Sequence, residues 1–174
     1  WNPEVAEGAF AMPKLSMKLD EVATKETESY YGLVLIHEGP YDGLAESIAK
    51  AFGLAAQTGV MFMPTAVCVY TNDPTKVADP SDLRTEVIVP LMVMGPPPKS
   101  PEGAEVRPIP SMEVASMVVK GPYGAREGEI IGKLTAWAAA KDRTPSGPPR
   151  VIYFHNPALV VDEDQISEIQ IPVK

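Results

Sequence analysis

The sequence predicts an α+β fold of two pseudo-symmetric β-α-β-β modules, with antiparallel sheets, one main helix in each module and a ligand cleft between the modules. Three observations support this prediction. Short motifs recur in the same order at a near-constant offset, stretches of strand character alternate with helical patterns, and Gly-Pro pairs separate the two. A chain of 174 residues is also long enough to bury a core of its own.

The internal repeat begins with the tripeptide Gly-Pro-Tyr, at residues 39–41 and again at 121–123, an offset of 82. Four anchors in one order and at nearly one spacing indicate a duplication. The other matched segments are "LRTEVIVP" (83–90) with "QISEIQIP" (165–172), which holds two anchors at the same offset, and "VYTNDP" (69–74) with "IYFHNP" (152–157) at an offset of 83.

Each copy predicts the same order of elements. An apolar strand ends at Gly-Pro, a helix follows, and two further strands close the copy. The expected strands are 30–38, 65–71 and 84–90 in the first copy and 112–120, 150–155 and 166–173 in the second. Apolar residues at helical spacing predict the helices. These residues are Leu44, Ile48, Ala51, Phe52 and Ala55 in the first copy and Ile130, Leu134, Trp137 and Ala138 in the second.

The domain organisation follows from the repeat. Residues 1–27 are expected to be an N-terminal arm or an extra strand, 28–94 the first module, 95–104 a Pro-rich linker and 105–174 the second module. Because the chain starts at Trp1, we expect a missing upstream segment, which is a signal, an anchor or another domain. A cytoplasmic location is favoured, and an exported or membrane-tethered one if a signal or anchor preceded Trp1.

Composition excludes several classes of function. The net charge of -8 argues against direct nucleic-acid binding and suits a cationic small molecule. Cys68 is the only cysteine, so no internal disulfide forms, and no apolar run is long enough to span a membrane. The spacing of His37 and His155 fits no zinc motif, and no cofactor fingerprint is present. The sequence thus predicts neither a metal nor a cofactor.

Glu86 and Glu168 are the candidate acids. They occupy matching positions in the last strand of each copy, and strand alternation places both on the face opposite the Val and Ile side chains that should pack on the helices. A strand glutamate is usually a solvated surface residue, but the repetition of the acid in both copies favours a groove between the modules. Glu168 is also the candidate catalytic residue if the protein is an enzyme.

Aromatic residues are the second candidate feature. Tyr70 and Tyr153 occupy matching positions shortly before the turns, and Trp137 lies on the apolar stripe of the second helix. A tryptophan on such a stripe is most often part of the core, and Tyr41 and Tyr123 are expected to seat the helices. A carboxylate among aromatic faces would receive a lipophilic cation through ion pairing and cation–π attraction.

These motifs together resemble the GyrI-like small-molecule-binding domain, over residues 28–174. That fold serves as the effector-binding domain of AraC-type and MerR-type multidrug regulators and as a stand-alone gyrase-inhibitory protein. The resemblance implies that Glu168 contacts cationic ligands and that Tyr153 and Trp137 form the aromatic wall. No helix-turn-helix is present, so a regulator would need an upstream domain, and residues 1–27 do not match the family's short lead-in.

Three functions remain open at this point. The favoured one is a binding protein for amphipathic, cationic or planar aromatic molecules, with Glu168, Glu86, Tyr70, Tyr153 and Trp137 around the ligand. The second is a hydrolase of cyclopropane-bearing electrophiles, which some family members are, using the same glutamate and aromatic residues. The third is a protein-interaction module, such as a gyrase inhibitor or a membrane-tethered adaptor. The sequence favours binding over catalysis.

Overall fold

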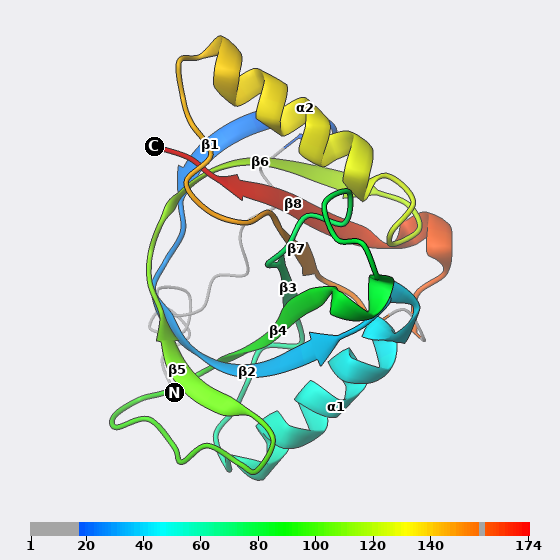
Figure 1. Ribbon diagram of the computed structural model, residues 1–174. Coiled ribbons are helices and arrows are strands. Elements are labelled where there is room, and N and C mark those ends of the chain that lie inside the picture. Colours follow the sequence, from blue (N-terminus) through cyan, green and yellow to red (C-terminus); the bar gives the residue numbers. More distant parts are fainter. Residues whose placement is uncertain (1–17, 157–158) are drawn as a thin grey trace.

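The computed structural model describes residues 18–156 and 159–174, so the greater part of the expected N-terminal arm lies outside the described residues. One antiparallel sheet has the strand order β1-β6-β8-β7-β3-β4-β2-β5 (Figure 1). The strands are β1 (Val22–Glu26), β2 (Tyr30–Glu38), β3 (Ala66–Tyr70), β4 (Arg84–Leu91), β5 (Glu105–Ile109), β6 (Glu113–Lys120), β7 (Arg150–Tyr153) and β8 (Ile166–Pro172). The helices are α1 (Leu44–Gln57) and α2 (Glu127–Ala140).

The predicted α+β fold with two related modules is confirmed. The first module runs β2-α1-β3-β4 and the second runs β6-α2-β7-β8. The structure adds that the modules share one continuous sheet, because β3 pairs with β7 in an antiparallel register that sets Val67 opposite Ile152. The boundary between the modules is therefore a line of backbone hydrogen bonds.

The two outer strands are exchanged between the modules. β5 begins 83 residues after β1, at Glu105 and Val22, yet β1 pairs with β6 of the second module and β5 pairs with β2 of the first. The short connections that follow β1 and β5 meet, because Thr27 N donates to Met112 O at 2.8 Å and Met112 N donates to Thr27 Oγ1 at 3.0 Å. The sheet must therefore curl, so that its two edges approach each other (Figure 1).

The sequence pattern did not identify β5. This strand is five residues long, carries two charged residues and contains Pro108, which cannot donate to a ladder. Such composition is typical of an edge strand, where unpaired backbone groups must be protected from other chains. The strand β1 lies within the segment 1–27 that was expected to be an arm or an extra strand.

The curled sheet has two different faces. Both helices pack on the outer face, where the main core contains residues such as Leu33, Val87, Ile130 and Ile169. Alternate strand residues point to the inner face, which has a smaller apolar cluster of its own, and these are Val34, Val67, Val69, Ile88 and Ile109. Among the described residues, no helix is long and apolar enough to cross a membrane.

The Gly-Pro-Tyr tripeptides turn the chain from strand to helix. Gly39 has a φ of 109° and Gly121 a φ of 130°, conformations that favour glycine. In the first copy the turn is also tied back to its strand, because His37 Nε2 lies 2.9 Å from Pro40 O. Each turn leaves its tyrosine at the start of the segment that leads into the helix.

Candidate functional site

A cavity of about 1310 Å³ lies on the outer face of the sheet, between α1 and α2 and over the junction of β3 with β7. Its lining is mostly apolar, with Leu44, Ile48 and Phe52 from α1 and Ile131 from α2. Because β3 and β7 belong to different modules, this cavity is the expected cleft between the modules. It lies on the helix-covered face, whereas strand alternation predicted a groove on the opposite face.

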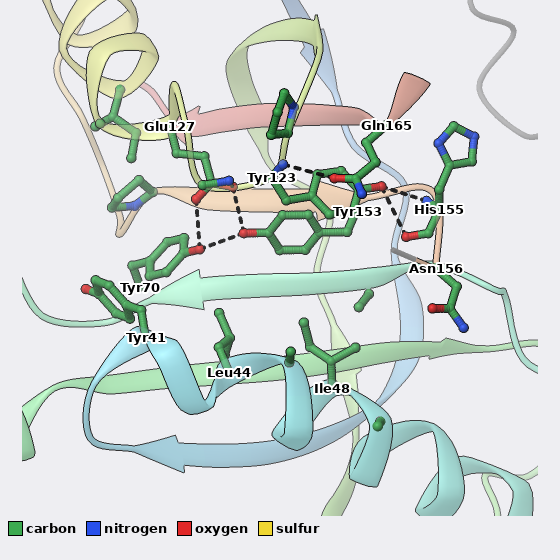
Figure 2. A pocket seen from close by; sticks show the side chains of 18 of the residues that line it. Tyr41, Leu44, Ile48, Tyr70, Tyr123, Glu127, Tyr153, His155, Asn156 and Gln165 are labelled. Carbon is green, nitrogen blue, oxygen red and sulfur yellow. Dashed lines mark hydrogen bonds between the residues drawn. The ribbon is translucent and has the colours of Figure 1, made fainter. Parts of the chain in front are cut away.

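Glu127, Tyr70 and Tyr153 form the polar centre of this cavity (Figure 2). The Tyr153 hydroxyl donates to Glu127 Oε1 at 2.8 Å, and the Tyr70 hydroxyl donates to Glu127 Oε2 at 3.2 Å. The two hydroxyl oxygens are themselves 2.9 Å apart. Gly124 N also donates to Glu127 Oε1 at 3.0 Å. The carboxylate therefore has a fixed position in the first turn of α2, where the helix dipole favours a negative charge.

The other two tyrosines of the cavity come from the Gly-Pro-Tyr turns. Tyr41 packs edge-on against Tyr70 with ring centroids 5.3 Å apart, and Tyr123 packs edge-on against Tyr153 at 4.7 Å. The two pairs are related by the internal repeat, and they meet where the hydroxyl oxygens of Tyr70 and Tyr153 are 2.9 Å apart. Four aromatic rings, two from each module, therefore line the cavity, and the inner two contact the Glu127 carboxylate through their hydroxyls.

A second group of hydrogen bonds holds Tyr123 in place. Its backbone N–H donates to Gln165 Oε1 at 3.0 Å, and its hydroxyl donates to the carbonyl of His155 or Ile166, each at 3.1 Å. The same hydroxyl accepts a bond from His155 N at 2.9 Å. Tyr123 has little freedom to leave the cavity wall, so this part of the site is pre-organised for a ligand.

Burial raises the pKa of Tyr70 and of Tyr153 well above the ordinary range of a phenol, and the nearby Glu127 charge raises both further. Both hydroxyls therefore stay protonated in the folded protein and act as donors to the carboxylate. Within this hydrogen-bonded group Glu127 carries the only charge. The two neutral phenols hold its carboxylate in place without neutralising it.

The raised phenol pKa values predict how stability depends on pH. The folded state retains protons that the unfolded state releases above about pH 10, so the free energy of unfolding should fall as pH rises through that value. The fall should be about 1.4 kcal/mol per pH unit for each such tyrosine. Chemical denaturation at increasing pH would measure it, and the double variant Tyr70→Phe/Tyr153→Phe should have a shallower slope. Equal slopes would contradict the assignment.

The structure brings together only part of the predicted site. Tyr70 and Tyr153 both line the cavity, but Glu168 and Glu86 lie on the inner face, across the sheet. Glu168 is 1% exposed and its Oε1 lies 2.6 Å from Lys25 Nζ. Each predicted acid thus has its own cation on that face, because Glu86 pairs in the same way with an arginine of β5 at 2.6 Å.

Trp137 is half-buried and packs against the main core from α2, the common role of a tryptophan on an apolar stripe. The predicted site did not include Tyr41, Tyr123 or Glu127, which lie at or beside the polar centre of the cavity. The two tyrosines had a signal, since they are part of the repeated Gly-Pro-Tyr. Glu127 had none, because the matching position in the first copy is Ala45 and the repeat therefore offers no second acid there.

The described residues contain no group of three or more His, Cys, Asp or Glu side chains that could hold a metal ion. His37 lies beside α1 with its Nδ1 2.8 Å from Ser47 Oγ. His155 belongs to the cavity wall, where its Nδ1 accepts from Ile166 N at 3.3 Å. The two histidines therefore serve separate local structures.

With this geometry in view, comparison with known proteins identifies the domain. The family model of the GyrI-like small molecule binding domain matches residues 91–174. Residues 91–174 carry a GyrI-like domain. The match spans the second module, which supplies Glu127, Tyr123 and Tyr153 of the cavity. No curated protein sequence matches the chain significantly.

Solved structures share the fold of this GyrI-like domain at low sequence identity. EcmrR in a complex with DNA has a TM-score of 0.74 and 18% identity, and the match covers 88% of this chain and 57% of that one. The chain therefore spans little more than half of that relative. The isolated EcmrR C-terminal domain has a TM-score of 0.69 and 18% identity, with 88% and 97% of the two chains covered.

Two further structures complete the comparison. A hydrolase from Listeria innocua has a TM-score of 0.67 and 10% identity, and the match covers 92% of this chain and 95% of that one. SAV2435, solved with bound tetraphenylphosphonium, has a TM-score of 0.54 and 12% identity, with 88% and 94% covered. At these identities the likeness establishes the fold.

Proposed function

We propose that this GyrI-like domain binds amphipathic cations, including planar aromatic ones, in the cavity between α1 and α2, with Glu127 as the charge anchor. The observation that carries the proposal is the Glu127 carboxylate held by the hydroxyls of Tyr70 and Tyr153 inside an apolar cavity. A fixed negative charge with aromatic faces around it selects a cation that also has apolar surface.

The charge of the cavity wall supports a cation over an anion. The described residues of the lining include three carboxylates, Asp73, Glu127 and Asp162, and neither lysine nor arginine. Asp73 is partly neutralised by Lys76 at 3.2 Å, and Asp162 is exposed and accepts from Gln165 Nε2 at 3.0 Å. Glu127 is half-buried, and the donors that contact its carboxylate are neutral. These carboxylates would repel an anionic ligand.

The aromatic rings add selectivity for shape. Tyr41, Tyr70, Tyr123 and Tyr153 present faces or edges to the cavity, and each ring face attracts a cation through its quadrupole, an effect of about 0.5–2 kcal/mol. The volume of about 1310 Å³ exceeds the usual range of drug-sized sites. The cavity therefore suits bulky ligands with several rings, and the tetraphenylphosphonium complex of SAV2435 is in keeping with this class.

The candidates on the inner face have a different proposed role. Glu168 and Glu86 each contact a cation of an exchanged edge strand, Lys25 of β1 and Arg107 of β5. These ion pairs favour a structural role, in which the two glutamates stabilise the packing of β1 and β5 against the sheet. A ligand-binding role for Glu168 and Glu86, and for Trp137 in α2, remains a prediction from the sequence.

Binding of tetraphenylphosphonium tests the proposal directly. Isothermal titration should give saturable binding of this cation, and much weaker binding of triphenylphosphine oxide, which retains three phenyl rings but has no net charge. Competition should displace a rhodamine dye from the same cavity. If the neutral compound binds as tightly as the cation, Glu127 does not act as a charge anchor. If neither compound binds, the proposed class of ligand is wrong.

Hydrolysis is the second candidate function, favoured by the contact between a carboxylate and two phenol hydroxyls. In that arrangement Glu127 would accept a proton from a water molecule whose oxygen bonds to one cyclopropane carbon as a ring C–C bond breaks, and the same proton would then be delivered to the electron pair of the broken bond. The aromatic rings would hold the planar substrate. Mass spectrometry of a cyclopropane-bearing alkylator incubated with the protein would detect the addition of one water. A rate equal to that in buffer would exclude this function for that substrate class.

A further inference from the structure

We infer that the inner face of the sheet contains a second binding site, which takes a small carboxylate on Arg150. Arg150 lies in β7 and is 8% exposed. Among the described residues, its Nε has no hydrogen-bond partner, and no ion pair involves its guanidinium. This face lies across the sheet from the cavity of Glu127, so the inference goes beyond the proposed function.

The strand register places Arg150 in the middle of a row that crosses the sheet. Gln170 of β8 pairs with Arg150, and Ser116 of β6 pairs with Gln170. On the other side Val69 of β3 pairs with Arg150, and Glu86 of β4 pairs with Val69. Ser116 is fully buried and its Oγ, like Arg150 Nε, has no partner in the described part of the chain. The same row therefore holds two buried polar groups that can donate hydrogen bonds.

The ion pairs of the inner face do not include Arg150. Glu168 is paired with Lys25 at 2.6 Å, and Glu86 is paired with Arg107 at 2.6 Å. Glu105 also contacts Arg107, at 3.6 Å, but its side chain is 64% exposed and lies at the sheet edge. Glu168, which is buried, and Glu86, which is partly buried, are thus each paired with their own cation, whereas Arg150 has no ion-pair partner among the described residues.

A buried guanidinium without an acceptor is costly. Its neighbours include the apolar cluster of Val67, Val69 and Ile88, and burial lowers the pKa of the Arg150 guanidinium. Tyr30 and Glu86 lie near enough to influence that charge, but Glu86 already accepts from Arg107. Removing one partner of a buried ion pair destabilises proteins strongly, because the other charge is left uncompensated. An anion from solution would supply the missing partner.

A carboxylate fits this position better than other small anions. The guanidinium presents its N–H groups in a planar fork, and the two oxygens of a carboxylate accept from such a fork in parallel. The surrounding apolar side chains suit the hydrocarbon end of the ligand and disfavour a strongly hydrated, doubly charged anion. Formate and acetate are therefore the probes of choice.

Titration of the full chain with sodium acetate, against equal concentrations of sodium chloride, tests the site. We expect acetate to raise the thermal unfolding midpoint saturably and more than chloride does. Arg150→Met keeps the length and apolar body of the side chain, and it should bind acetate at least about tenfold more weakly. The cavity variant Glu127→Gln should respond to acetate as the wild type does, which separates this site from the one proposed above.

A direct spectroscopic measurement complements the titration. The Nε–H signal of Arg150 in a nitrogen-correlated NMR spectrum, assigned by its absence from Arg150→Lys, should move saturably with acetate. Arg150→Lys also keeps the charge, which protects the test if Arg150→Met does not fold. An acetate effect equal to that of chloride, an Arg150→Met response equal to the wild type, or an unmoved Arg150 signal would each overturn the inference.

Discussion

A Glu127→Gln variant should bind tetraphenylphosphonium at least about tenfold more weakly than the wild-type chain, a loss of about 1.4 kcal/mol or more. The substitution removes the charge but keeps the shape of the side chain and an oxygen that accepts from the Tyr153 hydroxyl. The cavity should therefore stay formed while its attraction for a cation disappears. Isothermal titration of both proteins with the same cation measures the difference.

Glu168→Gln is the matched control for this experiment. It makes the same chemical change at the acid that the sequence pattern indicated, on the far side of the sheet and against Lys25. Its affinity for the cation should stay close to that of the wild type, and so should the affinity of Glu127→Gln for triphenylphosphine oxide. If Glu168→Gln binds tetraphenylphosphonium much more weakly than the wild type while the affinity of Glu127→Gln is unchanged, the charge anchor is Glu168.

Lys25→Met should lower the free energy of unfolding by about 3 kcal/mol, the largest effect that we expect from a substitution outside the cavity. Lys25 is the partner of Glu168, which is 1% exposed, so its removal leaves a buried negative charge without compensation. It also frees the exchanged strand β1 from the second module. Urea denaturation of the full chain measures the change.

Two further variants give this prediction its controls. In the double variant Lys25→Met/Glu168→Gln the uncompensated charge is gone, so most of the lost stability should return. Lys18→Met breaks an exposed pair with Glu21 at 3.5 Å and should change the free energy of unfolding by no more than about 0.5 kcal/mol. If Lys25→Met is as mild as Lys18→Met, the buried pair does not fasten β1.

Much of the fold could be predicted because its signals are local. The strand 30–38 and the order of elements in both modules follow from alternation, helical spacing and Gly-Pro turns, all of which act within about ten residues. The exchange of β1 and β5 could not be predicted in this way. Both strands are short and polar. Which strand each one pairs with depends on the curl of the whole sheet, which brings its two edges together.

Part of the cavity lining was predicted from the sequence, and the reason is again physical. Duplication pointed to positions present in both copies, so it found Tyr70 and Tyr153, which meet on the line between the modules. The same criterion selected Glu86 and Glu168 and passed over Glu127. The carboxylate at the polar centre of the cavity belongs to the second module only, so a search for repeated positions could not find it.

The sequence by itself determined the repeated module, its elements and the turns that join them, because backbone preferences and apolar spacing depend on residues that are close in the sequence. Only the tertiary structure decided which face of the sheet carries the cavity and which acid lies in it. That decision depends on where two helices and a curled sheet leave space. It placed Glu127, and not Glu168, in the cavity, and it left Arg150 buried without an ion-pair partner among the described residues.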